Sequence, residues 1–130
     1  MKQEKILALK IANWLKVEYP WAMYRFDLAA DLKLTIGQAK RNKELNRFKK
    51  YPDLFIAETN ENYSGLYIEL KSKRSEIYKK DCSFRESSHI AGQRAMLGAL
   101  SMRGYRAVFC CGFEEAKSEI EKYMKDVKRK

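Results

Sequence analysis

Hydrophobic residues recur at helical spacing in the first segment of the chain. Residues 2–18 carry an apolar stripe formed by Leu7, Ile11, Trp14 and Leu15. This spacing predicts a helix, which Pro20 ends because proline has no backbone N–H with which to continue the pattern. Apolar and polar residues then alternate over residues 21–28, and this period of two predicts a strand.

The middle of the chain predicts a hairpin of two strands. Apolar residues dominate residues 53–58 and 66–71, and the segment between them is rich in Asn, Ser and Gly, as in hairpin loops. The basic segment before the hairpin, residues 37–50, is expected to be partly helical. The segment after it, residues 72–86, is polar and basic, so we expect a loop there.

The last third of the chain predicts a helix, a strand and a second helix. The first helix is expected from Ser88, a favourable N-cap residue, to Arg103. Residues 106–111 predict a buried strand, and residues 113–127 predict a final amphipathic helix. The strands on either side of the first of these helices can lie parallel through a crossover connection. We therefore predict one α/β domain over residues 1–130, with a mixed sheet flanked by helices.

The charge balance narrows the range of partners. The chain of 130 residues contains 27 Lys and Arg against 17 Asp and Glu, a net charge of +10 at pH 7. This surplus favours nucleic acid as a partner, although a merely soluble basic protein has the same composition. No apolar run reaches the roughly 18 residues that span a bilayer, and the first residues are too polar for a signal peptide. We expect a cytoplasmic protein with no membrane partner.

Candidate chemistry is concentrated on the predicted hairpin. Side chains alternate along a strand, so Glu69 and Lys71 share one face while the apolar residues beside them point to the other. Asp53 begins the partner strand, where its carboxylate can approach Glu69. Two neighbouring carboxylates are costly unless a cation lies between them, and Mg²⁺ suits oxygen ligands. An alternative interpretation is that Glu69 and Lys71 form an ordinary surface ion pair.

In the metal-site interpretation, Asp53 and Glu69 hold Mg²⁺ together with the backbone carbonyl of Leu70. Lys71 then orients or deprotonates the attacking water and stabilises charge on a scissile phosphate. This is the chemistry of phosphodiester hydrolysis. The Glu-x-Lys spacing alone is weak, because Glu115 and Lys117 have the same spacing within a predicted helix.

The stretch from Arg41 to Tyr123 resembles the VRR-NUC domain, a branch of the PD-(D/E)xK nucleases. The matching pieces, in chain order, are Arg41-Asn-Lys-Glu, Phe48-Lys, Pro52-Asp-Leu-Phe, Gly65-Leu-Tyr-Ile-Glu-Leu-Lys71, Gln93, Gly104-Tyr, Gly112-Phe-Glu-Glu-Ala, Ile120 and Tyr123. The resemblance implies the restriction-endonuclease-like αβββαβ core, here followed by a C-terminal helix. It also implies a metal-dependent deoxyribonuclease that uses Mg²⁺, with Mn²⁺ able to substitute.

The resemblance assigns roles to individual residues. It implies metal ligation by Asp53 and Glu69, a catalytic Lys71 and a supporting amide at Gln93. An acidic residue on the first helix often assists in this fold, and Glu4 is the candidate, with Glu18 as the alternative. Small stand-alone members, bacterial or phage-encoded, resemble Holliday-junction resolvases, which implies branched DNA as the substrate and a homodimer as the active form.

Gln93 is also singled out by its position on the predicted helix. It shares an apolar stripe with Ile90, Leu97 and Leu100, so a polar amide points toward the core. A buried amide needs hydrogen-bond partners. Both a metal site and a hydrogen bond to another helix would satisfy it.

The sequence departs from the family pattern in three places. Tyr51 stands where the family usually has a Gly before Pro-Asp, and residues 29–35 replace an Asn-Gly-rich turn. The segment between Lys71 and Gln93 is longer than usual. These departures leave the substrate preference open, and none removes a catalytic group.

Two basic clusters are candidate contacts to the DNA backbone, although charge runs are often simply solvated. The first consists of Lys40, Arg41, Lys43 and Arg47, continued by Lys49 and Lys50. The second consists of Lys73, Arg74, Lys79, Lys80 and Arg85. Tyr63, Tyr67 and Tyr78 are candidates either for stacking on exposed bases or for packing in the sheet.

Three hypotheses follow from the sequence. The leading one is a Mg²⁺-dependent DNA endonuclease that is selective for DNA structure. The second is a non-catalytic DNA-binding or docking module that retains the nuclease fold. The third is a structural basic protein that binds nucleic acid through charge alone, for which salt-sensitive binding without cleavage is expected.

Overall fold

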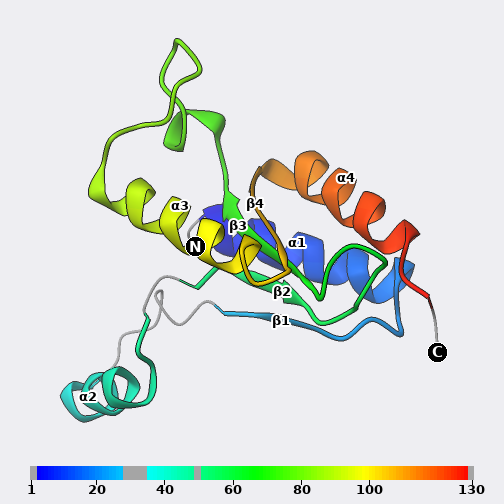
Figure 1. The fold of residues 1–130 in the computed structure, drawn as a ribbon, viewed down its shortest axis with the longest axis horizontal. Coiled ribbons are helices and arrows are strands. Elements are labelled where there is room, and N and C mark those ends of the chain that lie inside the picture. Colours follow the sequence, from blue (N-terminus) through cyan, green and yellow to red (C-terminus); the bar gives the residue numbers. More distant parts are fainter. Residues whose placement is uncertain (1–2, 28–34, 49–50, 129–130) are drawn as a thin grey trace.

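The chain folds around a sheet of four strands with helices on both faces (Figure 1). The computed structural model describes residues 3–27, 35–48 and 51–128. The elements in chain order are α1 (Gln3–Glu18), β1 (Tyr24–Phe26), α2 (Ile36–Leu45), β2 (Leu54–Ile56), β3 (Leu66–Lys71), the 3₁₀ turn η2 (Arg74–Glu76), α3 (Ser88–Ser101), β4 (Arg106–Cys111) and α4 (Gly112–Lys125). None of the described helices is long and apolar enough to cross a bilayer.

The sheet has the mixed topology expected from the sequence. Its strand order is β1-β2-β3-β4, with β1 and β3 antiparallel to β2 and β4 parallel to β3. The crossover between the parallel strands contains α3. The predicted α/β fold with a C-terminal helix is therefore confirmed, and β3 lies inside the sheet with a neighbour on each side.

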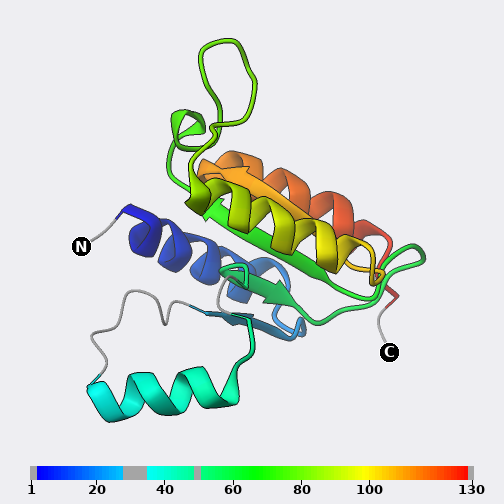
Figure 2. The same ribbon diagram turned by 60° about the vertical axis from the view of Figure 1, so that its left-hand side comes forward.

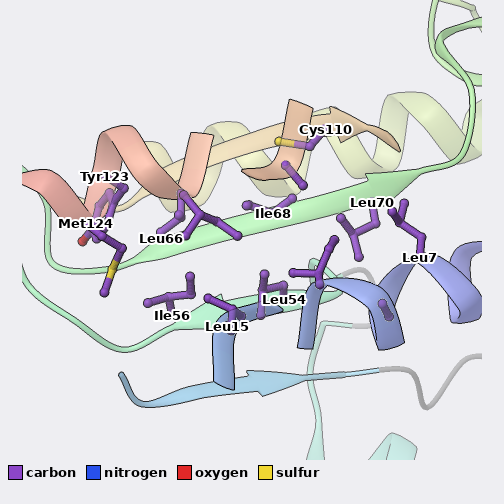
Figure 3. Packing of buried hydrophobic residues seen from close by; sticks show 14 residues of the cluster. Leu7, Leu15, Leu54, Ile56, Leu66, Ile68, Leu70, Cys110, Tyr123 and Met124 are labelled. Carbon is purple, nitrogen blue, oxygen red and sulfur yellow. The ribbon is translucent and has the colours of Figure 1, made fainter. Parts of the chain in front are cut away.

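One face of the sheet carries the main hydrophobic core (Figure 3). Leu66, Ile68 and Leu70 of β3 are 0–1% exposed and pack with buried residues of α1 and α4. The register places Leu54 beside Ile68, so successive strands present their apolar residues to the same layer. The uniformly apolar face predicted for the third strand is confirmed.

The C-terminal helix α4 is fastened to its own sheet. The Tyr123 hydroxyl donates to the Glu58 carbonyl at 2.6 Å, and the Asn60 side-chain amide donates to the Tyr123 carbonyl at 3.3 Å. At the other end of the contact, Arg106 of β4 donates to Glu119 of α4 at 2.7 Å. These contacts place α4 on the sheet of its own chain.

The second face of the sheet is covered by α3 on the side of β4 (Figure 2). Ile90, Leu97 and Leu100 of α3 are buried and lie outside the main core cluster. On the same face, the Phe55 ring of β2 stacks on the Tyr67 ring of β3, with 4.4 Å between ring centroids. This face therefore holds a smaller apolar layer and, as described below, the polar site.

Several boundaries differ from those expected. The first strand covers only Tyr24–Phe26, because the backbone still turns at Ala22, whose N–H bonds the Tyr19 carbonyl at 3.0 Å. Residue 28 lies outside the described residues. The N-cap of α3 is Ser87 and not Ser88, since the Ser87 side chain accepts the Ile90 N–H. The strand predicted over residues 106–111 is present as β4, but it is less buried than expected: Cys110 is buried and its other residues are partly buried.

The two basic segments stand away from the sheet (Figures 1 and 2). The helix α2 confirms the partly helical prediction; it begins with a capping box between Thr35 and Gln38 and has no buried residue. Residues 72–86 contain η2 and a bridge between Tyr78 and Phe84, so the expected loop carries local structure. The Arg94 guanidinium of α3 lies 3.8 Å from the Phe84 ring centroid and holds this loop to the helix.

Gly65, at the start of β3, marks a close approach between backbone and ring. A Cβ atom there would lie 2.7 Å from Phe55 Cε1 and 3.2 Å from the Ile56 carbonyl oxygen.

We predict that Gly65→Ala destabilises the fold by about 1–3 kcal/mol in urea unfolding, because the ring and the strand must shift. Gly98→Ala is the matched control: nothing lies within 4 Å of its Cβ position. It should stabilise helix α3 by about 0.5–1 kcal/mol. Equal effects for both variants would contradict the packing argument.

Candidate active site

The predicted carboxylates meet at the C-terminal end of β3. Asp53 directly precedes β2, and the β2–β3 register continues to place it opposite Glu69. The Asp53 carboxylate Oδ2 accepts the backbone N–H of Leu70 at 2.9 Å. This hydrogen bond fixes the Asp53 side chain against β3, beside the Glu69 side chain that projects from the same face.

Gln93 approaches Glu69 from α3, the helix that covers this face of the sheet. Its Nε2 donates to Glu69 Oε1 at 2.5 Å, and the two residues are 8% and 6% exposed. Of the two explanations for a buried amide at this position, the hydrogen bond to another helix is therefore wrong, and the amide serves the carboxylate. Within the described part of the chain, Gln93 Oε1 has no hydrogen-bond partner although it is buried. A buried carbonyl oxygen of this kind is an acceptor that a donor such as a water molecule would satisfy.

The electrostatics of Glu69 show that the site is short of positive charge. Burial and the neighbouring charge of Asp53 raise the pKa of Glu69 to about 8, while Lys71 and hydrogen bonds from Asp53 and Gln93 act in the opposite direction. The net direction means that the charged form of Glu69 is poorly compensated. A cation bound between the two carboxylates would supply the missing compensation.

Lys71 lies next to this pair and is only 6% exposed. The surface ion pair, the alternative interpretation of Glu69 and Lys71, is excluded because neither side chain is at the surface. The charge of Lys71 favours the ionised forms of both Glu69 and Glu76. The charge of Lys71 therefore acts on the carboxylates at this end of β3, including Glu69.

Glu76 is a member of the site that the sequence did not reveal. Its carboxylate accepts a hydrogen bond from the Ser72 hydroxyl and is in hydrogen-bonding contact with the Glu4 side chain. Burial alone would raise the pKa of Glu76, but the contacts with Ser72, Glu4 and Lys71 together outweigh it, so the pKa lies below its usual value. No periodic pattern marks Glu76, because it follows the end of the strand in a segment predicted to be a loop.

The structure places the two acidic candidates on the first helix at opposite ends of that helix. Glu4 is in the first turn of α1, at the end that lies near Leu70, whereas Glu18 is the last residue of that helix. An α-helix rises about 1.5 Å per residue, so the two side chains are separated by roughly 20 Å along the axis. Glu4 contacts the Glu76 side chain, whereas Glu18 lies at the far end of the helix.

A second residue missed by the sequence analysis is Asp27. The β1–β2 register continues past the end of β1, where the Asp27 N–H donates to the Asp53 carbonyl at 2.7 Å. Asp27, Asp53 and Glu69 are therefore in register with one another across the ends of β1, β2 and β3. The strand predicted over residues 21–28 includes Asp27, but the sequence analysis does not say which strand pairs with it. The position of Asp27 beside Asp53 is therefore not predicted.

These residues fit a magnesium ion better than a transition metal. Among the described residues, no group of three or more His, Cys, Asp or Glu side chains is placed to hold a metal. Mg²⁺ is usually bound by one or two carboxylates and keeps several waters, so Asp53 and Glu69 are sufficient. In a strand, the C=O of a residue points to the same side as its N–H, so the Leu70 carbonyl also faces Asp53. The unpartnered Gln93 oxygen is an acceptor suited to a metal-bound water.

The described residues of both predicted basic clusters are exposed, but the clusters differ in their contacts with other residues. Every described residue of the first cluster is exposed on or just after α2: Lys40, Arg41, Lys43 and Arg47. Lys49 and Lys50 lie outside the described residues. In the second cluster, Arg74 contacts Glu115 at 3.8 Å, Lys79 contacts Glu86 at 3.4 Å, and Arg85 donates to the Ser75 carbonyl.

The remaining members of the second cluster, Lys73 and Lys80, are exposed. Surface contacts such as those of Arg74 and Lys79 are weak, so they leave the side chains available to a phosphate backbone.

The fold is shared with a solved structure described as a VRR_NUC domain protein. The two superpose with a TM-score of 0.69 over 95% of this chain and 89% of that chain, at 23% sequence identity. No family model and no curated protein matches the sequence. The resemblance inferred from the sequence is therefore confirmed at the level of the fold.

The raised pKa of Glu69 predicts an unusual dependence of stability on pH. In the folded protein Glu69 binds its proton more tightly than in the unfolded chain, so the fold loses stability as pH rises from about 4.5 to about 8. We predict that, with chelator present, Glu69→Gln increases the free energy of unfolding at pH 9 by roughly a few kcal/mol, because the neutral amide carries no buried charge. The gain should shrink toward pH 5.

Urea unfolding at the two pH values measures this effect, and Glu61→Gln at an exposed carboxylate is the control. The control should show no pH-dependent gain. A Glu69→Gln variant that is no more stable than wild type at pH 9 would show that the carboxylate is already compensated without metal.

Proposed function

We propose that the protein is a Mg²⁺-dependent DNA endonuclease of the PD-(D/E)xK type. The observation that carries the proposal is the closed set of contacts at the end of β3, in which a buried Glu69 is held by Gln93 and flanked by Asp53 and Lys71. Burying a carboxylate, an ammonium group and an amide together, beside the partly buried carboxylate of Asp53, is costly for a merely structural sheet. The shared fold supports the same assignment, because it is the fold of a VRR_NUC domain protein.

Asp53 and Glu69 would hold the metal, with the Leu70 carbonyl and the Gln93 oxygen as further acceptors. Bound there, Mg²⁺ would act as a Lewis acid on a phosphate and would provide an activated water at neutral pH. The chain itself supplies orientation: Asp53 is fixed by the Leu70 N–H, and Gln93 fixes Glu69 in one rotamer. Such fixed geometry is what catalysis by positioning requires.

Lys71 supplies the positive charge that the chain itself brings to the reaction. Its ammonium group can donate hydrogen bonds to the attacking water and to a non-bridging phosphate oxygen. The charge of Lys71 also acts on Glu76, whose carboxylate is in hydrogen-bonding contact with Glu4. Donors aimed at developing charge in a site with little water contribute strongly to catalysis.

The charge distribution supports DNA as the substrate. The net charge is +10, and the exposed basic residues of α2 and of the 72–86 loop lie outside the carboxylate site. Such groups bind phosphates without reading sequence. We further propose branched DNA, as cut by Holliday-junction resolvases, and a homodimer as the active form; analytical ultracentrifugation tests the second of these.

We predict that labelled four-way junctions are cleaved in Mg²⁺ or Mn²⁺ and that Lys71→Ala lowers the cleavage rate by about 10²–10⁴-fold. The reason is the loss of the ammonium group beside the scissile phosphate. Lys117→Ala is the matched control, because Lys117 follows Glu115 at the same spacing but lies on α4, away from the site. It should keep at least half of the wild-type rate.

The same preparations distinguish an enzyme from a binding module. Calorimetric titration should show that Asp53→Asn weakens binding of Mn²⁺ by at least tenfold, because it removes one of two carboxylate ligands. DNA binding without cleavage in every metal, with no metal binding by the wild type, would refute the endonuclease and favour the non-catalytic module.

A further inference from the structure

A groove of about 350 Å³ opens between the helix α3 and the segment that leads into β2. Two aromatic rings, a run of small or flexible side chains of α3 and one cation line it: Phe48, Tyr51, Ala95, Met96, Ala99 and Arg103. Phe48 is 55% exposed and Tyr51 is 46% exposed, so both rings present surface to solvent. The chain leaves this apolar surface uncovered beside its most polar site.

The aromatic wall of the groove continues through Tyr51 into a cluster of rings on the sheet. The Tyr51 ring lies 6.4 Å from the Tyr67 ring, which in turn stacks on Phe55 at 4.4 Å and meets Tyr105 edge-on at 5.2 Å. These rings rest on the sheet, so Tyr51 is supported from behind. A ring held in this way can stack on a ligand with little loss of conformational entropy.

The groove and the carboxylate site share the same structural elements. Tyr51 is separated from Asp53 only by the buried Pro52. Phe55 and Tyr67 lie two residues from Asp53 and Glu69 on their strands, and therefore on the same face of the sheet. A molecule in the groove would lie beside whatever is bound at Asp53 and Glu69.

The opposite wall is formed by residues too small to fill the groove. Gly92, Ala95 and Ala99 follow one another at helical spacing on α3 and line the groove together. Gln93, next to Gly92, points the other way and bonds Glu69. The same helix therefore supports the catalytic carboxylate with one face and forms the groove with another.

The chemistry of this groove suits a nucleobase better than a protein surface. A base is flat and apolar on both faces, and its attached phosphates are negative. The groove offers aromatic faces for stacking, and Arg103 and the exposed cations of α2 carry the complementary charge. A second copy of this chain would bring the same cations and a net charge of +10 to the contact.

We propose that this groove receives an unpaired nucleobase of the DNA that is bound at the carboxylate site. The inference rests on the proposed nuclease function and specifies its substrate class: DNA with an unpaired or unstacked nucleotide next to the scissile phosphate. A fully paired duplex has no free base face to offer. Selectivity for DNA structure then follows from the groove, without contacts that read sequence.

The test uses the full chain carrying Lys71→Ala, so that binding is measured without cleavage. The probes are a duplex with one unpaired 2-aminopurine and the same duplex fully paired. Stacking on the aromatic wall should quench the fluorescence of the unpaired probe on binding. The unpaired probe should bind about tenfold or more tightly than the paired one.

Two groove substitutions and one control substitution are each combined with Lys71→Ala. Ala95→Leu fills the groove and Phe48→Ala removes one ring; each should abolish the quenching and most of the tenfold preference, leaving binding of paired duplex unchanged. Ala91→Leu places the same side chain on an exposed position of α3 outside the groove and should change nothing. Preference and quenching that persist in both groove variants overturn the inference.

Failure of the groove and failure of the nuclease give different results. If wild type cleaves paired and unpaired DNA at equal rates, and Ala95→Leu leaves both rates unchanged, the groove proposal is wrong and the nuclease stands. If quenching and preference are present but wild type cuts neither probe in any metal, the groove stands as a base-binding site and the nuclease is refuted. If Ala95→Leu converts a dimer to a monomer in sedimentation and leaves quenching intact, the groove holds a second copy and the inference is overturned.

Discussion

The hydrogen bond between Gln93 and Glu69 is the interaction on which the rest of the site depends. It joins α3 to the middle of the sheet at a point where both partners are buried, so it sets how closely the helix approaches β3. It also holds a carboxylate whose charge is opposed by burial and by Asp53. The fold thus keeps the charged form of Glu69 poorly compensated, and a cation bound beside it would supply the missing charge.

The two faces of the sheet divide the work between stability and chemistry. The face toward α1 and α4 is filled by fully buried aliphatic residues such as Ile68 and Leu70. The other face carries Glu69 and Lys71 at the alternate positions of the same strand. Because side chains of one strand alternate, a single segment of six residues serves the core and the site at once. A shift of register by one residue would exchange the two sets.

Features that follow from periodicity along the chain are predictable from the sequence, whereas contacts between remote segments are not. Alternation in residues 66–71 gave both the buried face and the placement of Glu69 and Lys71. Gln93 was found because a polar residue interrupts an apolar stripe. Glu76 was missed because its partners, Ser72 and Glu4, approach only through tertiary contacts. The groove was missed for a similar reason, since Tyr51 and Ala95 are remote in sequence.

The crossover through α3 has a consequence for the time at which the site exists. Asp53 and Glu69 come from neighbouring strands, but Gln93 follows in the helix that leads to β4, and β4 pairs in parallel with β3. Parallel pairing requires the whole connection to be present and folded. The hairpin of β2 and β3 alone brings Asp53 and Glu69 together, and Gln93 joins Glu69 only once α3 has packed on the sheet. Completion of the candidate site is therefore coupled to the packing of the crossover on the sheet.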